Sequence, residues 1–259
     1  MTNQIDKVTY RPIIYILLVF AITWVCAFFK PILNCETQGL IIWVSDFAES
    51  ASPLIAALFL LRKNLLKNNY LFRFFLGANK GIVRYIVVAC LFILQFLNFY
   101  LFISENVTVK LSAFTTTFVG QLFFGGALEE GGWRGYLQPA FEKKLPVALS
   151  VLCVGLIWAC WHLPYFFMPD NMHTGGNFLF YIFTTVVTSF ILTAIHKLTG
   201  SVLLCTVFHG WQNTIVMSVP TDMGHPGFMI IFILLGVISL AICLRIGKTE
   251  QPELKPLKV

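Results

Sequence analysis

Long apolar runs occupy most of the chain, and they leave few folds open to it. The run from Leu111 to Leu128 is one of several along the 259 residues. A helix needs about 20 mostly apolar residues to cross the hydrocarbon core of a bilayer. Inside lipid, every backbone hydrogen bond must be made within the protein, and a helix achieves this on its own. We therefore expect an all-α, polytopic membrane protein.

Composition leads to the same fold class, because 58% of the residues are hydrophobic and only 12% are charged. Such a chain has too little polar surface to cover a soluble globule. The apolar runs predict about eight transmembrane helices in a single membrane domain, residues 1–259, which ends in a polar cytoplasmic tail at 246–259. The predicted spans are 12–29, 41–62, 82–104, 111–141, 146–168, 177–196, 200–218 and 227–245.

The positions of the basic residues predict the orientation. Of the 18 Lys and Arg residues, Arg134 lies within a span, Lys30 and Lys110 lie outside, and the other fifteen are cytoplasmic if the N-terminus is. This excess on one side predicts that both termini are cytoplasmic. The net charge of +6 therefore indicates contact with anionic lipid and not nucleic-acid binding. The inner basic residues are Lys7, Arg11, Arg62, Lys63, Lys67, Arg73, Lys80, Arg84, Lys143, Lys144, Lys197, Arg245, Lys248, Lys255 and Lys258.

Several polar residues and thiols have ordinary structural explanations. The seven cysteines include no Cys-x-x-Cys pair, and we expect buried apolar thiols. Asp46 and Glu49 share one helix face and are interpreted as structural, with the lining of a polar cavity as the alternative. His173, His196 and His225 fall in predicted loops, where we expect solvated surface.

The segment Glu129–Arg134, Glu-Glu-Gly-Gly-Trp-Arg, is the strongest candidate for a functional site. Ionisable groups at membrane depth are rare and mark chemistry or transport. In a helix, Arg134 lies one turn from Glu130, and Trp133 lies one turn from Glu129. The arginine can thus hold one carboxylate while the other stays available, and the two glycines let another helix or a substrate approach. The alternative is a structural ion pair between helices.

Two further polar groups follow in later spans. His162 lies one turn after Trp158, and Pro164 frees a backbone carbonyl nearby, which a membrane tolerates only where other polar groups compensate. His209 and Asn213 share a face of the seventh predicted span, where they could simply form hydrogen bonds between helices. Taken singly, each group has an ordinary structural explanation.

Depth in the membrane connects these groups. Counted from the predicted inner ends at about 1.5 Å per residue, Glu129, His162 and His209 all lie roughly 18 to 26 Å deep. This agreement predicts one polar cavity that holds a carboxylate, two imidazoles, an amide and a guanidinium. These are the components of a site that activates water for hydrolysis.

The residue types suggest a role for each candidate. Glu129 with His162 could deprotonate a water molecule aimed at a peptide carbonyl. His209 and Asn213 could donate hydrogen bonds to the oxyanion that develops, a contribution of about 3 to 4 kcal/mol for a well-placed donor.

The adjacent carboxylate has two possible roles. Glu130 would be oriented by Arg134, or it would share a proton with Glu129, because neighbouring carboxylates resist double ionisation.

Three ordered motifs in this region resemble those of the CAAX-protease and bacteriocin-processing family (CPBP, or Abi) of intramembrane proteases, which includes the Ras-converting CAAX endoprotease. The motifs are Glu-Glu-x-x-x-Arg at Glu129–Arg134, aromatic-x-x-x-His at Trp158 and His162, and His-x-x-x-Asn at His209 and Asn213. The strings Glu-Glu-Gly-Gly-Trp-Arg-Gly-Tyr-Leu-Gln-Pro and Trp-His-Leu-Pro are similar to its bacterial branch. The resemblance covers roughly residues 110–218, and Trp158 stands where the usual pattern has phenylalanine.

The resemblance implies an eight-helix intramembrane endopeptidase, multi-pass in a bacterial cell membrane. In it, Glu129 and His162 activate water, and His209 and Asn213 form the oxyanion hole. The implied partners are the lipid bilayer and a peptide, a leader sequence or a membrane-protein segment as substrate. The implied roles are CAAX-type proteolysis and bacteriocin maturation or immunity.

The need for a metal is left open by the sequence, since this family is often labelled as metalloproteases. Zinc held by Glu129, His162 and His209, with an open fourth position, is chemically reasonable. There is no His-Glu-x-x-His motif, however, and the neighbouring Arg134 disfavours a dication. We therefore expect a glutamate-dependent mechanism without a cofactor.

Two other classes of function compete with hydrolysis. In a proton-coupled transporter, carboxylates and histidines would relay protons across the membrane. The acids here cluster at one height in the second half of the chain, and no two similar halves are visible. The other class is a non-catalytic membrane scaffold or immunity protein that keeps the pocket without using it.

Overall fold

The computed structural model describes residues 10–29, 38–65, 69–77, 80–105, 108–168 and 171–248, and within them it contains helices and no strand. The helices are α1 (Pro12–Phe29), α2 (Gln38–Leu65), α3 (Tyr70–Leu76), α4 (Ile82–Leu101), α5 (Leu111–Phe123), α6 (Glu130–Gly132), α7 (Gln138–Glu142), α8 (Val147–Trp161), α9 (Phe178–Thr199), α10 (Val202–Ser218) and α11 (Pro226–Ile246). A 3₁₀ turn (Ala127–Glu129) precedes α6, a π-helical turn (Trp133–Leu137) separates α6 from α7, and a 3₁₀ turn (Leu163–Phe166) follows α8.

The expectation of an all-α polytopic membrane protein is confirmed. In the described part of the chain, six helical stretches are long and apolar enough to cross a membrane. The helices α8 and α10 are shorter, with 15 and 17 residues. All eight predicted spans correspond to helical stretches, and the short α3 was not predicted because it lies in an assumed inner loop.

Two predicted spans are less regular than expected. The span 111–141 is interrupted after Phe123, because Gly126 has φ +93, a left-handed conformation that only glycine adopts readily. The helical part of the span 146–168 ends at Trp161. Pro164 disfavours the helical conformation in the residue before it, and the chain continues as a 3₁₀ turn. His162 therefore caps a helix and does not lie inside one.

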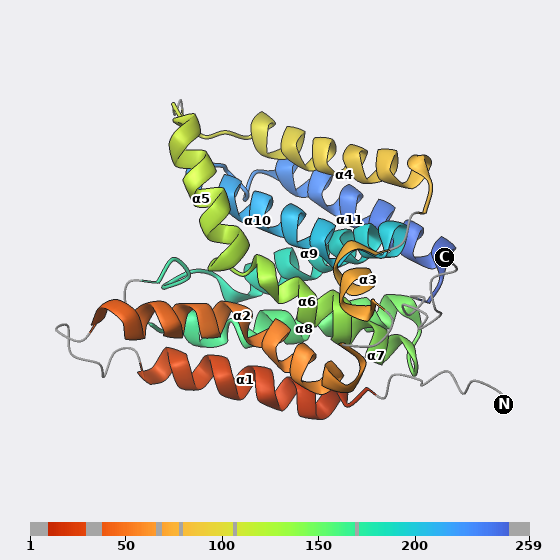
Figure 1. Cartoon of the computed structure of the whole chain (residues 1–259). Coiled ribbons are helices and arrows are strands. Elements are labelled where there is room, and N and C mark those ends of the chain that lie inside the picture. Colours follow the sequence, from red (N-terminus) through yellow and green to blue (C-terminus); the bar gives the residue numbers. More distant parts are fainter. Residues whose placement is uncertain are drawn as a thin grey trace.

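The segment around α6 lies in the interior of the helix bundle. In Figure 1, α1 and α2 run side by side along one edge and α4 lies along the opposite edge, with α6 and α8 between them. Residues of α2 and of α10 both contact α6 and the 3₁₀ turn before it. The Glu129–Arg134 motif is thus placed between α2 and α10.

The two motif glycines permit close packing against α2. A side chain at Gly131 would collide with Leu54, and one at Gly132 would collide with Pro53 and with the Tyr15 hydroxyl. This confirms the prediction that these glycines let another helix approach, here α2.

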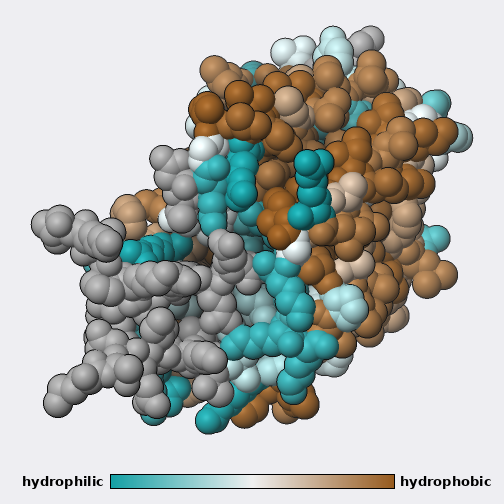
Figure 2. Space-filling model, turned by 90° about the vertical axis from the view of Figure 1, so that its right-hand side faces the viewer, coloured by the Kyte–Doolittle hydropathy of each residue, from teal (hydrophilic) through white to brown (hydrophobic). Residues whose placement is uncertain are grey.

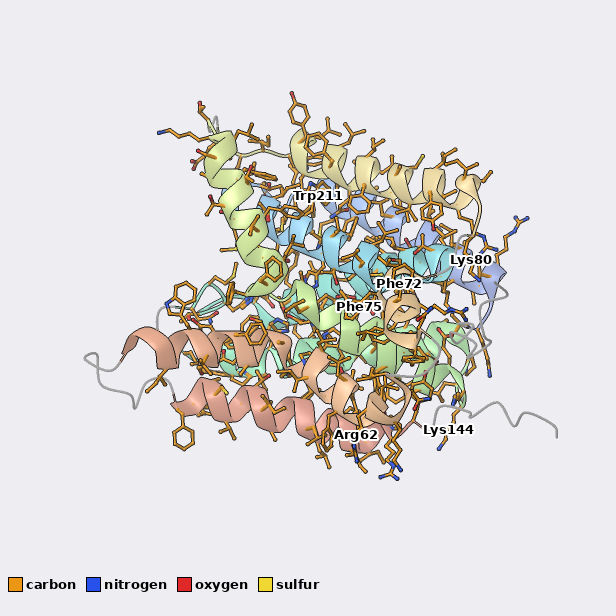
Figure 3. All side chains as sticks on the ribbon, viewed as in Figure 1. Arg62, Phe72, Phe75, Lys80, Lys144 and Trp211 are labelled. Atoms are coloured by element: carbon orange, nitrogen blue, oxygen red, sulfur yellow. The ribbon has the colours of Figure 1, made fainter. Side chains whose placement is uncertain are left out.

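Basic residues gather toward the end of the molecule where α1 begins and α11 ends. Arg62, Lys80 and Lys144 lie toward this end (Figure 3). Figure 2 shows the same end, where hydrophilic side chains gather beside a large apolar surface. Lys197 differs from these surface residues, because its side chain is buried and paired with Glu142 (Nζ to Oε1, 2.9 Å).

Other expectations for polar residues and thiols are corrected in part. The six cysteines that the structure describes are free, but Cys90 and Cys160 are exposed. His196 is buried within α9 and not solvated, because that helix continues to Thr199. Cys35 and the tail from residue 249 onward lie outside the described residues.

Candidate active site

Glu129 is held at one of its two carboxylate oxygens. Oε2 accepts hydrogen bonds from the indole Nε1 of Trp133 at 3.1 Å and from that of Trp158 at 2.6 Å. The first bond confirms the predicted one-turn pairing of Glu129 with Trp133. The other oxygen, Oε1, lies against Gly126 so closely that a side chain there would collide with it. This carboxylate is 3% exposed, and its Oε1 accepts no hydrogen bond among the described residues.

The carboxylate of Glu130 contacts two side chains, one at each oxygen. Its Oε2 lies 3.2 Å from Nη1 of Arg134, and its Oε1 lies 3.0 Å from Nδ1 of His209. Both carboxylate and guanidinium are fully buried. The predicted pairing one turn apart is therefore confirmed, and the same carboxylate also connects the first motif to the third. Arg134 additionally donates from Nη2 to the backbone carbonyl of Ser189 at 3.4 Å.

His162 has a defined ring orientation. Its Nδ1 lies 3.0 Å from the backbone carbonyl oxygen of Trp158. Because a carbonyl oxygen can only accept, Nδ1 carries the hydrogen and Nε2 of a neutral ring has the free lone pair. Around the imidazole, the rings of Trp161, Tyr165 and Tyr181 lie with centroids 4.6, 5.9 and 5.2 Å away. The imidazole of His162 is thus half-buried and surrounded by aromatic rings.

His209 contacts both other motifs. Besides its Nδ1 contact with Glu130, its ring stands edge-on to Trp158, with centroids 5.1 Å apart. Because the carboxylate of Glu130 accepts, the hydrogen bond places a proton on Nδ1 and directs Nε2 away from Glu130.

Asn213 uses its amide group differently from the prediction. Its Nδ2 donates to Oε1 of Gln121 at 3.2 Å and to the backbone carbonyl of Gly125 at 3.0 Å. The two amide hydrogens therefore connect α10 to α5 and to the irregular segment that follows α5. Nδ2 also lies 3.9 Å from the position that a Cβ atom at Gly126 would occupy. Gly126 is the glycine that lies against Oε1 of Glu129. Asn213 can donate to an oxyanion only when one of these two hydrogen bonds is broken.

Trp158 is the common neighbour of the candidate residues. It donates to Glu129, its ring centroid lies 6.3 Å from that of His162, and it contacts His209. Among the residues that the structure describes, no hydrogen bond joins Glu129 directly to His162. The convergence that depth predicted is thus observed, with the indole of Trp158 at its centre.

Two residues of this neighbourhood were missed or given a minor role from the sequence. Glu49 of α2 is buried and accepts a hydrogen bond from the Tyr165 hydroxyl at 2.9 Å. Its position inside an apolar segment was the signal, and its hydrogen bond to Tyr165 places it beside a neighbour of His162. His173, expected to be solvated, is half-buried, and its ring centroid lies 5.8 Å from that of His162. His225 is exposed, as expected.

The donors proposed for zinc are not brought together. Within the described ranges, no three His, Cys, Asp or Glu side chains are grouped so that they could hold a metal ion. Nδ1 of His162 faces a backbone carbonyl and Nδ1 of His209 faces Glu130, so Nε2 is the free ring nitrogen of both residues. In this arrangement, Glu129, His162 and His209 are not grouped as a three-ligand zinc site would require.

Fold and site together define an integral membrane protein with a buried acid, imidazole and amide cluster between its helices. Residues 110–215, from α5 to α10, match the model of a protein family described as type II CAAX prenyl endopeptidase Rce1-like. The matched segment carries all three motifs, which confirms the resemblance seen in the motifs. The match supports a CAAX-type intramembrane protease in general, a class that acts on peptide or protein substrates in a membrane. No curated protein matches the chain.

Proposed function

We propose that the chain hydrolyses peptide bonds of membrane-associated peptides or proteins with a water molecule activated by Glu129 and His162, without a metal. The anchoring of Glu129 is the observation that supports this most strongly. Two indoles fix one carboxylate oxygen and leave the other available. A purely structural carboxylate in an apolar bundle would gain from pairing both oxygens, because an unpaired buried acceptor is unfavourable.

In the proposed reaction, the water lies between Oε1 of Glu129 and Nε2 of His162. These groups take its proton while its oxygen attacks the carbonyl carbon of the substrate. The proton then passes to the amide nitrogen, and the C–N bond breaks. One water is consumed, and the products are a new carboxyl terminus and a new amino terminus.

The developing oxyanion would be stabilised by the third motif. His209 would donate from Nε2 while its Nδ1 is held by the carboxylate of Glu130. Arg134 orients Glu130 through their ion pair. Asn213 would give a second hydrogen bond once substrate displaces Gln121 or the Gly125 carbonyl from its amide.

The substrate we propose is a peptide, a leader sequence or a segment of another membrane protein, with bacteriocin maturation or immunity as the biological setting. The location we propose is a bacterial cell membrane, with both termini in the cytoplasm. The basic residues at one end of the molecule favour this orientation.

The test compares wild type with Glu129→Ala and His162→Ala in proteoliposomes that contain candidate membrane peptides. Each protein is assayed with and without EDTA or o-phenanthroline. We expect each variant to lose at least about a hundredfold in cleavage rate, the usual contribution of a general base. The chelators should have no effect.

Full cleavage by both variants would refute the assignment of these residues. Loss of wild-type cleavage on chelation would support a metal instead. Glu105→Gln, a change at an exposed carboxylate, is the matched control and should cleave like wild type.

A further inference from the structure

Glu49 is a third carboxylate near the candidate site, and it comes from outside the family-matched segment 110–215. It lies on α2 within an apolar stretch and is 5% exposed. A carboxylate at this depth is unfavourable unless it is paired. One of its observed partners is the Tyr165 hydroxyl, which donates to Oε2 at 2.9 Å.

The helix that carries Glu49 is firmly placed. Its neighbour Ser52 lies 2.7 Å from the hydroxyl of Thr23 on α1, and Thr23 also donates to the Glu49 carbonyl. One turn further along α2, Pro53 packs against Gly132 of the first motif. The carboxylate of Glu49 therefore projects from a frame that is packed against the Glu129–Arg134 segment itself.

Tyr165 is tied to His162 in two ways. Its backbone N–H donates to the His162 carbonyl at 3.0 Å, which closes the 3₁₀ turn after α8. Its ring stands edge-on to the imidazole, with centroids 5.9 Å apart. Movement of this tyrosine would thus move the wall against which the imidazole rests.

We propose that Glu49 and Tyr165 form a positioning pair that holds His162 with its Nε2 directed toward the water and the carboxylate of Glu129. One hydrogen bond, from Nδ1 to the Trp158 carbonyl, holds the imidazole of His162, and the remaining contacts that fix the ring come from the aromatic side chains around it. Tyr165 supplies one of these rings, and its hydrogen bond to Glu49 anchors that ring to α2. This inference rests on the proposed function, because it assigns His162 the role of base.

A simple staple between α2 and the turn after α8 is the competing explanation. A staple would change stability, but the folded fraction would cleave at the normal rate. A positioning pair predicts a lower kcat with an unchanged KM, because misplacement of a reacting group slows chemistry more than it weakens binding.

The experiment measures kcat and KM in proteoliposomes for Tyr165→Phe, Glu49→Leu, Glu49→Gln and the double variant Tyr165→Phe/Glu49→Leu. We expect about a tenfold or larger loss in kcat for Tyr165→Phe and for Glu49→Leu. The double variant should lose no more than either single one, since the two residues act as a unit. Glu49→Gln should retain most of the activity, because the amide oxygen still accepts from Tyr165. Tyr100→Phe, at an exposed tyrosine, is the control.

A second measurement needs no turnover. Diethyl pyrocarbonate modifies free imidazole nitrogens, and mass spectrometry gives the rate at His162 with the exposed His225 as internal reference. We expect the rate at His162 to rise several-fold in Tyr165→Phe and Glu49→Leu and to stay near wild type in Glu49→Gln. An unchanged rate, or an unchanged kcat with only lower thermal stability, would overturn the inference.

The controls separate this inference from the proposed function. If Glu129→Ala and His162→Ala abolish cleavage while Tyr165→Phe cleaves normally, only the positioning pair is wrong. If Glu129→Ala and His162→Ala cleave normally, the assignment of the catalytic residues fails, and the modification rates alone then decide whether Tyr165 orients His162.

Discussion

Nε1 of Trp158 lies 2.6 Å from Oε2 of Glu129, so the second motif contacts the first through its aromatic residue and not through its histidine. His162 follows Trp158 by one turn and turns its Nδ1 back to the Trp158 carbonyl. With the aromatic-x-x-x-His spacing, Trp158 contacts both groups. Its indole Nε1 binds the carboxylate of Glu129, and its backbone carbonyl binds the imidazole of His162. A shift of a single residue in this spacing would separate them by about 100° around the helix.

Removal of the indole N–H tests this relationship. Trp158→Phe keeps an aromatic wall but leaves Trp133 as the remaining indole donor to Glu129. A hydrogen bond to a charged group contributes about 1.5 to 3 kcal/mol, so we expect kcat to fall about tenfold or more. Cleavage assays in proteoliposomes measure this, with Trp43→Phe at an exposed position as control. Equal rates for the two variants would show that the bond is not needed.

Gly126 is required by its conformation and by its neighbour. With φ +93 and Oε1 of Glu129 directly beside it, alanine would be strained and would displace the carboxylate. We expect Gly126→Ala to lose at least about tenfold in kcat. Gly120→Ala, where a side chain meets open space, should behave like wild type. An active Gly126→Ala variant would contradict the placement of Oε1.

A buried ion pair lies where α7, α9 and the end of α11 meet. Nζ of Lys197 lies 2.9 Å from Oε1 of Glu142, and it also donates to the Gly247 carbonyl at 2.6 Å. Lys197→Met leaves the buried carboxylate without this cation, and the loss of one partner is expected to destabilise by about 3 to 5 kcal/mol. Thermal unfolding in detergent measures the effect.

The matched variants identify the cause of that loss. Lys144→Met removes an exposed lysine nearby and should leave the unfolding temperature unchanged. Lys197→Met/Glu142→Leu should recover much of the stability, because no buried charge is then left over. A single Lys197→Met variant as stable as Lys144→Met would show that the pair contributes little.

The loop before α9 should respond to pH. His173 stacks on Phe166 with ring centroids 5.2 Å apart, and burial lowers the pKa of His173 below its usual value near 6.5. The packed loop prefers the neutral ring. The contribution of neutral His173 to the stability of the loop is therefore fully present above about pH 6.5. It is lost as the pH falls toward the lowered pKa.

Hydrogen exchange of the backbone amides at 171–177, corrected for intrinsic rates, should show weaker protection at pH 5.5 than at pH 7.5. His173→Phe keeps an aromatic ring against Phe166 and cannot titrate, so its protection should not change with pH. The same acid effect in both proteins would assign the change to another group.

Local rules predicted the parts of the site that lie within one helix. The pairs Glu130 with Arg134 and Glu129 with Trp133 follow from one-turn spacing, and both are present. The equal depth of the three motifs followed from counting residues along apolar spans, and Trp158 and His209 indeed meet. These inferences succeeded because helices in a bilayer have a fixed rise and few alternative conformations.

The remaining features depend on contacts between segments far apart in the chain. Asn213 directs its amide to Gln121 and Gly125 because the chain opens after Phe123, an interruption that hydropathy does not reveal. Lys197 is buried because the end of α11 brings the Gly247 carbonyl to it. Glu49 reaches the site only because α2 packs on α6, and no local pattern encodes that pairing.

The most direct test of the account is the isosteric change Glu129→Gln. It keeps the size of the side chain and one oxygen but removes the carboxylate that would take the proton from water. Wild type, Glu129→Gln and Glu105→Gln are reconstituted with the same membrane peptide, and mass spectrometry counts newly formed peptide termini. The account predicts products from wild type and Glu105→Gln, and at least about a hundredfold fewer from Glu129→Gln. Products from Glu129→Gln at the wild-type rate would contradict it.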